Sequence, residues 1–454
     1  MYTSTPAAVL PRDRGAAAAP KLARLITCRT VSSRVPGEVD DAEFARFRAE
    51  LAVLFPAVHE QLALEEVGGG LLFHWQGREP GSDPLVLMAH YDVVPVQDES
   101  TWEHPPFAGV LADGYVHGRG ALDDKGSLAA ILEAVETLLA EGFVPSRSVY
   151  LSFGDNEETA GDTAAHAAAL LQERGIRPWL VLDEGGAVAA QAFPFVKPPV
   201  AVIGVSEKGI LDVELSVGDP GGHASTPNRL GAAARLARAV VRLDRRPFPA
   251  ALHPVTLEML NRLAAGASPL PAALFARAAS LRLPLTRIFG ALGGEPNALT
   301  RTTVALTQLA GSKASNVLPT RATANANVRI APGESIESVL RRMRRTIRDR
   351  KVSLRVVEGS EPSPVSSTSN AQFALLEAVV REVFPDAIPA PYIMLGGTDS
   401  RRFTAISDAV YRFAPFRMDK AARGSIHADN EKLSVATLGE GIEFYRLLLQ
   451  NPVP

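Results

Sequence analysis

Acidic residues and one histidine stand directly after three short apolar runs of this chain. The groups are His90 and Asp92 after residues 84–89, Glu157 and Glu158 after 149–153, and Asp183 after 179–182. Because the carboxyl ends of strands meet at one edge of an open α/β sheet, we expect these side chains to converge there. Asp123 and His427 lie in polar segments elsewhere and would complete the group. Two imidazoles and several carboxylates in one place are the ligands of a zinc pair.

The spacing of His90 and Asp92 suits a metal ligand and the residue that orients it. A metal-bound imidazole needs an acceptor for its second ring nitrogen, and a carboxylate two residues away can provide one. Taken alone, the pair is better explained by a strand-end histidine beside a solvated aspartate, and the other groups reverse that preference. Asp123 and Asp124 precede a predicted helix, so one of them can cap the helix while the other binds metal. We assign the metal to Asp123.

The adjacent glutamates are the sharpest signal for catalysis. Two neighbouring carboxylates at a strand end repel each other unless a positive charge lies beside them. One of Glu157 and Glu158 can then bind metal while its neighbour takes a proton from a metal-bound water. The alternative is a pair of solvated surface glutamates. Asp183 and His427 are ordinary loop residues by themselves, and His223, in the Gly-rich segment 221–227, is as well explained as a turn residue.

Length and composition describe an ordinary globular protein of more than one domain. The 454 residues exceed one core, and 46% are hydrophobic and 21% charged. A net charge of −3 argues against a nucleic-acid or anionic-membrane partner, and the basic segment 341–345 has the spacing of a solvated helix face. A single cysteine, Cys28, excludes an intrachain disulfide and fits a reducing compartment. No apolar run approaches the ~20 residues of a membrane span, so we expect a cytoplasmic protein without a membrane partner.

The order of predicted elements divides the chain into an α/β domain and an insertion. A helix after Asp123, a strand at 148–153, a helix at 162–174 and a strand at 179–182 indicate a mostly parallel sheet covered by helices. Later the order is strand, helix 230–244, strands 303–309 and 322–330, helix 335–350 and strand 352–357, a ferredoxin-like β-α-β-β-α-β module. We therefore expect a catalytic domain of residues 1–205 and 361–454, with 1–20 a loose tail, and an inserted lid or dimerisation domain at 206–360.

Several segments together resemble one known family. They are 87–95, 102–107, 118–126, 205–209, 301–303, 315–319 and 411–415. The chain is similar over nearly its whole length to the di-zinc peptidases of clan MH that include carboxypeptidase S, aminoacylase, carnosinase and glutamate carboxypeptidase. The resemblance is strongest to the branch with carboxypeptidase S and the N-fatty-acyl-amino-acid synthase/hydrolase. Asn156 stands where relatives often have Asp, but both glutamates that follow it are present.

The resemblance implies a role for each matching position. It implies two Zn²⁺ ions, replaceable by Co²⁺ or Mn²⁺, with Asp123 bridging them. His90 and Asp183 would bind one ion, and Glu158 and His427 the other. Glu157 would be general base and acid, Asp92 would orient His90, and His223 would polarise the scissile carbonyl, in cis or from a second subunit. Asn316, Arg329, Gly397 and Thr398 match substrate-binding positions, and Arg329 suits a carboxylate.

The expected activity is hydrolysis of the amide bond of N-acyl amino acids. The motivation for an acyl substrate is an apolar stretch within 270–289, for which lid packing or a dimer interface is an equal alternative. A dipeptidase or carboxypeptidase acting on small peptides with a free carboxylate is the second hypothesis. The third is a non-catalytic metal-binding relative, which predicts the loss of a ligand or of the base, and all of these positions are occupied. The family also implies a homodimer through the inserted domain.

Overall fold

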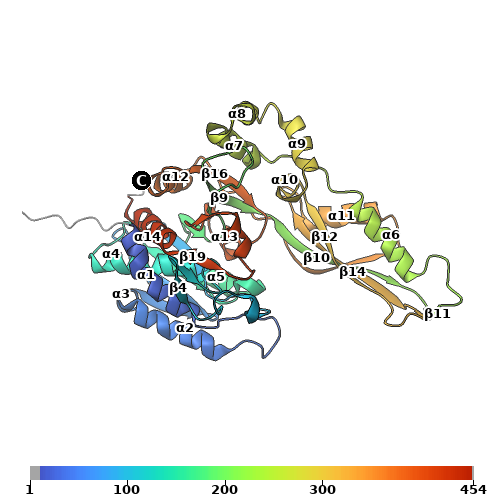
Figure 1. The fold of residues 1–454 in the computed structure, drawn as a ribbon, viewed down its shortest axis with the longest axis horizontal. Helices are drawn as coiled ribbons and strands as arrows, with labels where there is room; N and C mark the ends of the chain where they lie inside the picture. Colours follow the sequence, from blue (N-terminus) through green and yellow to red (C-terminus); the bar gives the residue numbers. More distant parts are fainter. Residues whose placement is uncertain (1–10, 452–454) are drawn as a thin grey trace, which may run out of the picture.

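The computed structural model describes residues 11–451 and has a mixed sheet at the centre of its larger domain (Figure 1). The sheet has ten strands in the order β1-β2-β6-β3-β7-β17-β9-β8-β18, with β16 paired to β9. The central strands β6, β3, β7 and β17 run parallel, and antiparallel pairs flank them, so the predicted α/β class with a mostly parallel sheet is confirmed. The strands are β1 (Ala63–Val67), β2 (Gly70–Trp75), β3 (Leu85–His90), β6 (Val149–Gly154), β7 (Leu180–Asp183), β8 (Val188–Ala189), β9 (Val200–Glu207), β16 (Ile388–Met394), β17 (Val410–Arg412) and β18 (Arg417–Met418).

Helices cover both faces of this sheet, which explains why its central strands are apolar throughout. Every residue of β3 and β6 is buried, as expected for parallel strands enclosed on both sides. In β3, Leu85 and Leu87 belong to the core beneath one set of helices, and Val86 and Met88 to the core on the opposite face. The helices are α1 (Pro11–Ile26), α2 (Asp41–Leu54), α3 (Pro56–Gln61), α4 (Lys125–Ala140), α12 (Ala371–Val383) and α14 (Val435–Gln450) on the first face, and α5 (Thr163–Glu173) on the second.

The expectation of a loose tail over residues 1–20 is wrong for residues 11–20, and residues 1–10 lie outside the described part. Residues 11–26 form α1, which packs along α14. Small side chains permit this close approach, because a Cβ atom added at Gly15 would lie 2.0 Å from the carbonyl oxygen of Val435. Ala18 and Leu22 are buried in the same core. The Ala-rich composition that suggested a tail is therefore an adaptation to tight helix packing.

Gly15→Ala is expected to lower the free energy of unfolding by about 1–3 kcal/mol, the usual cost of overpacking. The alanine would be the better helix former, but its Cβ atom must displace the backbone of α14. Ala16→Leu, at an exposed position of the same helix, should change stability by less than about 0.5 kcal/mol. Urea unfolding of the two variants measures the difference, and equal midpoints would show that α1 does not pack as described.

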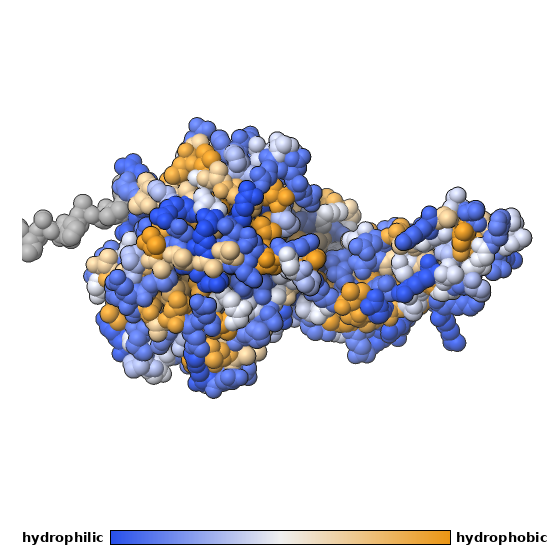
Figure 2. Space-filling view, turned by 90° about the horizontal axis from the view of Figure 1, so that it is seen from below, coloured by the Kyte–Doolittle hydropathy of each residue, from blue (hydrophilic) through white to orange (hydrophobic). Residues whose placement is uncertain are grey.

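The inserted domain has the ferredoxin-like order predicted from the sequence. Its antiparallel sheet runs β12-β14-β10-β15, and α6 and α11 pack on it. It projects from the larger domain as an arm (Figures 1 and 2). A two-stranded ribbon, β11 with β13, forms the far end of the arm. The elements are β10 (Gly209–Gly218), β11 (Gly222–His223), α6 (Ala232–Asp244), β12 (Thr303–Ala310), β13 (Val317–Leu318), β14 (Arg321–Ile330), α11 (Ile336–Ile347) and β15 (Ser353–Ser360).

The apolar stretch between α6 and β12 packs on the larger domain and not on the arm. It forms α7 (Pro254–Leu263), α8 (Pro269–Phe275), α9 (Arg282–Ala291) and α10 (Gly294–Ala298). Met259 and Leu263 share a buried cluster with Val200 of β9 and Tyr392 of β16. Leu270 and Leu283 are exposed, so only part of the stretch is core. Among residues 11–451, no helix is both long enough and apolar enough to cross a membrane.

Candidate metal centre

The candidate ligands come from five separate segments that meet at one edge of the large sheet. His90 ends β3, Asp183 ends β7, and Glu157 and Glu158 form the turn that follows β6. Asp123 lies two residues before the first residue of α4, and His427 follows α13 (Lys420–Ser425). The carboxyl ends of parallel strands thus deliver three of the groups, as the strand-end argument predicted.

Asp123 faces a different histidine with each of its carboxylate oxygens. Its Oδ1 lies 3.0 Å from Nε2 of His90, and its Oδ2 lies 2.9 Å from Nε2 of His427. The same His427 nitrogen lies 3.1 Å from Oε2 of Glu158. Ligand atoms of His90, Asp123 and Glu158 all lie within 4.8 Å of one another. Oε1 of Glu158 is buried without a hydrogen-bond partner, so the donor set fits a bound metal cation.

The pKa shifts in the cluster show that its carboxylates stabilise positive charge beside them. Hydrogen bonds with Asp123 and Glu158 raise the pKa of His427 to about 10. Burial alone would lower the pKa of His90, but its hydrogen bonds with Asp123 and Asp92 raise it well above its usual value. Burial alone would raise the pKa of Asp123, yet the hydrogen bonds from the two imidazoles hold it below its usual value. The carboxylates around the two imidazoles thus favour positive charge at this position, which is the condition for binding a cation.

Asp92 holds three of these groups in place at once. Its Oδ1 lies 3.3 Å from Nδ1 of His90 and accepts the backbone N–H of Glu157 at 3.1 Å. Its Oδ2 accepts the backbone N–H of Glu158 at 3.1 Å and the hydroxyl of Ser32 at 2.6 Å. Asp92 is fully buried, so these contacts do not compete with water. It therefore orients the histidine and the glutamate turn together.

The Glu157 carboxyl group is the best placed acid–base group of the cluster. Burial raises its pKa well above the usual value, and the charges of Asp399, Asp123 and Glu158 act in the same direction against the opposing effect of His90. Gly154 allows Asp399 to approach, because a Cβ atom at Gly154 would lie 2.7 Å from Oδ2 of Asp399. A carboxyl group with a raised pKa can give up a proton and take it back near neutral pH.

Glu431 is a structural residue that sequence reasoning missed. Its buried carboxylate accepts the backbone N–H groups of Gly120, Leu122 and Asp123, and it pairs with Arg119 at 2.7 Å. It lies four residues after His427, and nothing in the sequence distinguishes it from the other acidic residue of that polar segment. Through these bonds, the segment that carries His427 also fixes the backbone at Asp123.

Asp183 and Glu184 are adjacent candidates for one ligand position. Oδ1 of Asp183 accepts the N–H of Glu184 at 2.9 Å, and Oδ2 accepts the N–H of Ser400 at 2.7 Å. Burial raises the pKa of Glu184 well above its usual value, and the charges of Asp123, Asp124, Asp183 and Glu157 add to the effect. Asp183 was the ligand predicted from the sequence. Glu184 is a second candidate that sequence reasoning did not consider, and its burial beside the other acids is visible only in the folded chain.

We expect Glu184→Gln to lose about one metal ion per chain and Asp183→Asn to retain both. The reason is that the charges of Asp123 and Glu157 act on the buried carboxyl group of Glu184, whereas Asp183 has its contacts with the loop that carries Thr398 and Ser400. Metal content after dialysis, measured by mass spectrometry on variants of unchanged circular dichroism, distinguishes them. The opposite result would restore Asp183 as the ligand.

The predicted substrate residues fall into two groups. Thr398, in the loop with Gly397, bonds to buried Glu207, and Arg329 lies on β14 opposite Ile210, near the junction of the domains. His223 and Asn316 lie instead on the ribbon at the far end of the arm, where both are exposed (Figure 1). Nδ1 of His223 there contacts the hydroxyl of Ser225 at 2.6 Å. The structure does not bring these two residues to the cluster, so their roles stay predictions that require movement of the arm or a second chain.

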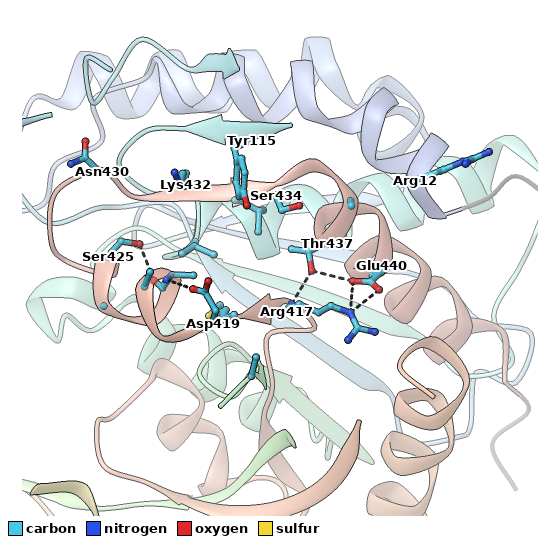
Figure 3. Close-up of a pocket in the computed structure, with 18 of the residues that line it drawn as sticks. Arg12, Tyr115, Arg417, Asp419, Ser425, Asn430, Lys432, Ser434, Thr437 and Glu440 are labelled. Carbon is cyan, nitrogen blue, oxygen red and sulfur yellow. Dashed lines mark hydrogen bonds and ion pairs between the residues drawn. The ribbon is translucent and has the colours of Figure 1, made fainter. Parts of the chain in front are cut away.

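A cavity of about 1010 Å³ lies behind the segment that carries His427 (Figure 3). It is enclosed by β18, α13, β19 (Lys432–Ser434) and the beginning of α14. Arg417, Thr437 and Glu440 bond to one another on one side of it. Its described lining includes Leu122, the neighbour of Asp123, but not the candidate ligands themselves. The cavity is therefore separate from the reaction site.

Comparison with known proteins points to one family. The model of peptidase family M20/M25/M40 matches residues 86–451. The probable carboxypeptidase S-like 2 of Dictyostelium discoideum is 35% identical over 442 residues, covering 95% of this chain and 84% of that protein. The human N-fatty-acyl-amino acid synthase/hydrolase PM20D1 is 37% identical over 432 residues, covering 93% and 84%. An M20 metallo-carboxypeptidase from Sulfolobus solfataricus has the same fold, with a TM-score of 0.68, 18% identity and coverage of 95% and 98%.

Proposed function

This chain belongs to peptidase family M20/M25/M40 and is a metallohydrolase of amide or peptide bonds, and from that premise we propose that it hydrolyses N-acyl amino acids. The observation that carries the proposal is the position of Glu157, an acid of raised pKa, beside a bridging aspartate and two imidazoles. The similarity to an N-fatty-acyl-amino acid synthase/hydrolase over most of both chains supports the acyl substrate.

We further propose that the centre holds two Zn²⁺ ions. Asp123 would bridge them, with His90 on one ion and with Glu158 and His427 on the other. The division of the Asp123 oxygens between the two histidines supports this assignment. Asp183 would bind the same ion as His90, and Glu184 is the alternative ligand at that position. When bound, the ions supply the Lewis acidity that activates water and polarises the scissile carbonyl.

The residues of the chain provide the proton transfers and the orientation of the substrate. Glu157 takes the proton of the attacking water and later delivers it to the leaving amine, so one carboxyl group serves as base and then as acid. Asp92 keeps His90 and the Glu157 turn in fixed positions while this occurs. Arg329 and the Gly397–Thr398 loop are the groups we propose to bind the substrate carboxylate.

A panel of N-acetyl, N-lauroyl and dipeptide substrates tests the substrate class. We expect the N-acyl amino acids to give the larger kcat/KM, and each substrate with its carboxylate converted to an amide to react more slowly. Faster cleavage of dipeptides would favour the second candidate, a dipeptidase or carboxypeptidase. The similarity to a carboxypeptidase S-like protein supports that candidate. No cleavage of any substrate by chain loaded with metal would contradict both.

A further inference from the structure

Two of the connections between the larger domain and the arm meet at one buried residue, Glu207. Glu207 is the last residue of β9 and is fully buried, and the chain leaves for the arm through Lys208. The returning chain passes Ser360 and then Ser363, whose hydroxyl accepts the N–H of Glu207 at 2.8 Å and whose N–H donates to the carbonyl of Glu207 at 3.1 Å. The outgoing and returning connections are therefore joined at this residue.

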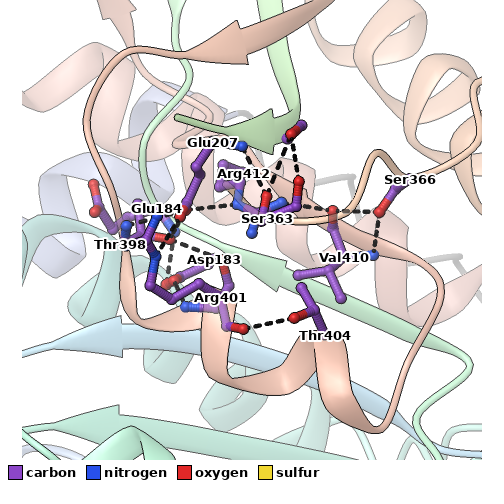
Figure 4. Close-up of polar contacts among 12 residues, drawn as sticks. Asp183, Glu184, Glu207, Ser363, Ser366, Thr398, Arg401, Thr404, Val410 and Arg412 are labelled. Atoms are coloured by element: carbon purple, nitrogen blue, oxygen red, sulfur yellow. Dashed lines mark hydrogen bonds and ion pairs between the residues drawn. The ribbon is translucent and has the colours of Figure 1, made fainter. Parts of the chain in front are cut away.

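Four donors converge on the Glu207 carboxylate (Figure 4). Oε1 accepts Nε of Arg412 at 2.8 Å, and from Thr398 it accepts the N–H at 3.0 Å and the hydroxyl at 2.7 Å. Oε2 accepts Nε of Arg401 at 2.9 Å. Charge-assisted hydrogen bonds in a buried site have well-defined directions, so the carboxylate fixes the positions of the side chains that donate to it.

Arg401 extends this arrangement to both of these connections, at Lys208 and at Ser360. Its guanidinium donates to the carbonyl oxygen of Lys208 at 3.0 Å and also to the hydroxyl of Ser360. On the arm side, Nζ of Lys208 donates to the carbonyl oxygen of Arg301 at 2.7 Å, two residues before β12. A change in the angle of the arm must therefore disturb the bonds of Arg401 or those of Lys208.

The same carboxylate is connected to the edge of the metal centre. The hydroxyl of Thr398 lies 2.7 Å from that of Ser400, and the N–H of Ser400 donates to Oδ2 of Asp183 at 2.7 Å. Thr398 belongs to the loop proposed to bind the substrate carboxylate. Two hydrogen-bonded steps thus separate the junction of the domains from the end of β7.

We propose that Glu207 is a positioning residue that couples the orientation of the arm to the position of the substrate loop. Its bonds to Thr398 hold the loop, and its bond to Arg401 holds the two connections, so the arm and the loop move together. The kinetic part of this inference rests on the proposed function, whereas the mechanical part does not. A carboxylate that serves only to neutralise buried guanidinium groups would affect stability but neither orientation nor substrate binding.

The test compares Glu207→Gln with Glu440→Gln. Glu440 accepts Nε of Arg417 at 2.9 Å in the larger domain, away from both connections, and so controls for the loss of an Arg–Glu pair. With metal content unchanged, we expect kcat/KM of Glu207→Gln to fall by about 10²-fold, the effect of a small misplacement of substrate, with a raised KM. Spin labels at Glu173→Cys and Arg344→Cys, both exposed, should give a broader interdomain distance distribution only in Glu207→Gln. Equal kinetics and equal distance distributions in the two variants would overturn the proposal.

A second pair of variants covers the case in which Glu207→Gln does not fold. Arg401→Met keeps the bulk of a side chain that is 14% exposed, and Thr398→Val removes only the hydroxyl. Because both act through Glu207, their combined effect on kcat/KM should be smaller than the product of the single effects. Fully multiplicative effects would contradict the coupling. If wild-type chain cleaves no substrate, the proposed function fails, while the interdomain distances of Arg401→Met still decide whether the arm is held by this arrangement.

Discussion

Glu157→Gln is expected to lower kcat by about 10²–10⁴-fold while the protein keeps its metal. The amide of Gln has nearly the shape of the carboxylate but can neither accept the proton of water nor return it to the amine. The N–H of residue 157 still donates to Asp92, so the turn and the Glu158 ligand stay in place. The measurement is kcat and metal content for wild type and variant on the best substrate of the panel.

The pH dependence gives this prediction a second readout. Since a base must be deprotonated to act, kcat/KM of the wild type should fall as the pH drops through the pKa of Glu157, which burial raises. The residual activity of Glu157→Gln should lack this acidic limb. Glu65→Gln, which removes only an exposed pair with Arg174, is the control and should behave as wild type. Activity of Glu157→Gln within tenfold of wild type would exclude Glu157 as the base.

Asp123→Asn should abolish both metal binding and activity. The neutral amide offers one weak oxygen ligand where the carboxylate offers one to each side, toward His90 and toward His427. Loss of Lewis acidity removes several kcal/mol of transition-state stabilisation, which corresponds to about 10³-fold or more in rate. Zn²⁺ should raise the melting temperature of wild type and of Asp113→Asn, an exposed control, but not that of Asp123→Asn. A variant that still binds two ions would refute the bridge.

Much of the fold could be predicted because its signals are local. The alternation of Leu211, Val213 and Leu215 marked β10, and the spacing of apolar residues in 336–347 marked α11. Strand ends also predicted that His90 and the Glu157–Glu158 turn would lie together. The tight packing of α1 was missed because small residues carry no apolar periodicity, and its partner, α14, lies more than 400 residues away in sequence.

The remaining features depend on contacts between distant segments. The buried ion pairs of Glu207 with Arg401 and Arg412 join residues about 200 positions apart, and no spacing of residues in the sequence predicts them. The choice between Asp183 and Glu184 depends on which backbone N–H groups the fold presents to each carboxylate. The position of His223 depends on the angle of the arm, which a sequence pattern of one domain does not encode.

The strand order also dictates when the enzyme can become complete during its synthesis. β17, from near the end of the chain, lies between β7 and β9, which are made more than 200 residues earlier. Until β17 arrives, the early strands lack a central neighbour, and Asp123 lacks both His427 and the anchor Glu431. A ribosome-bound or prematurely ended chain therefore carries only an incomplete set of ligands. We therefore expect hydrolytic activity only in chains translated at least as far as His427 and Glu431.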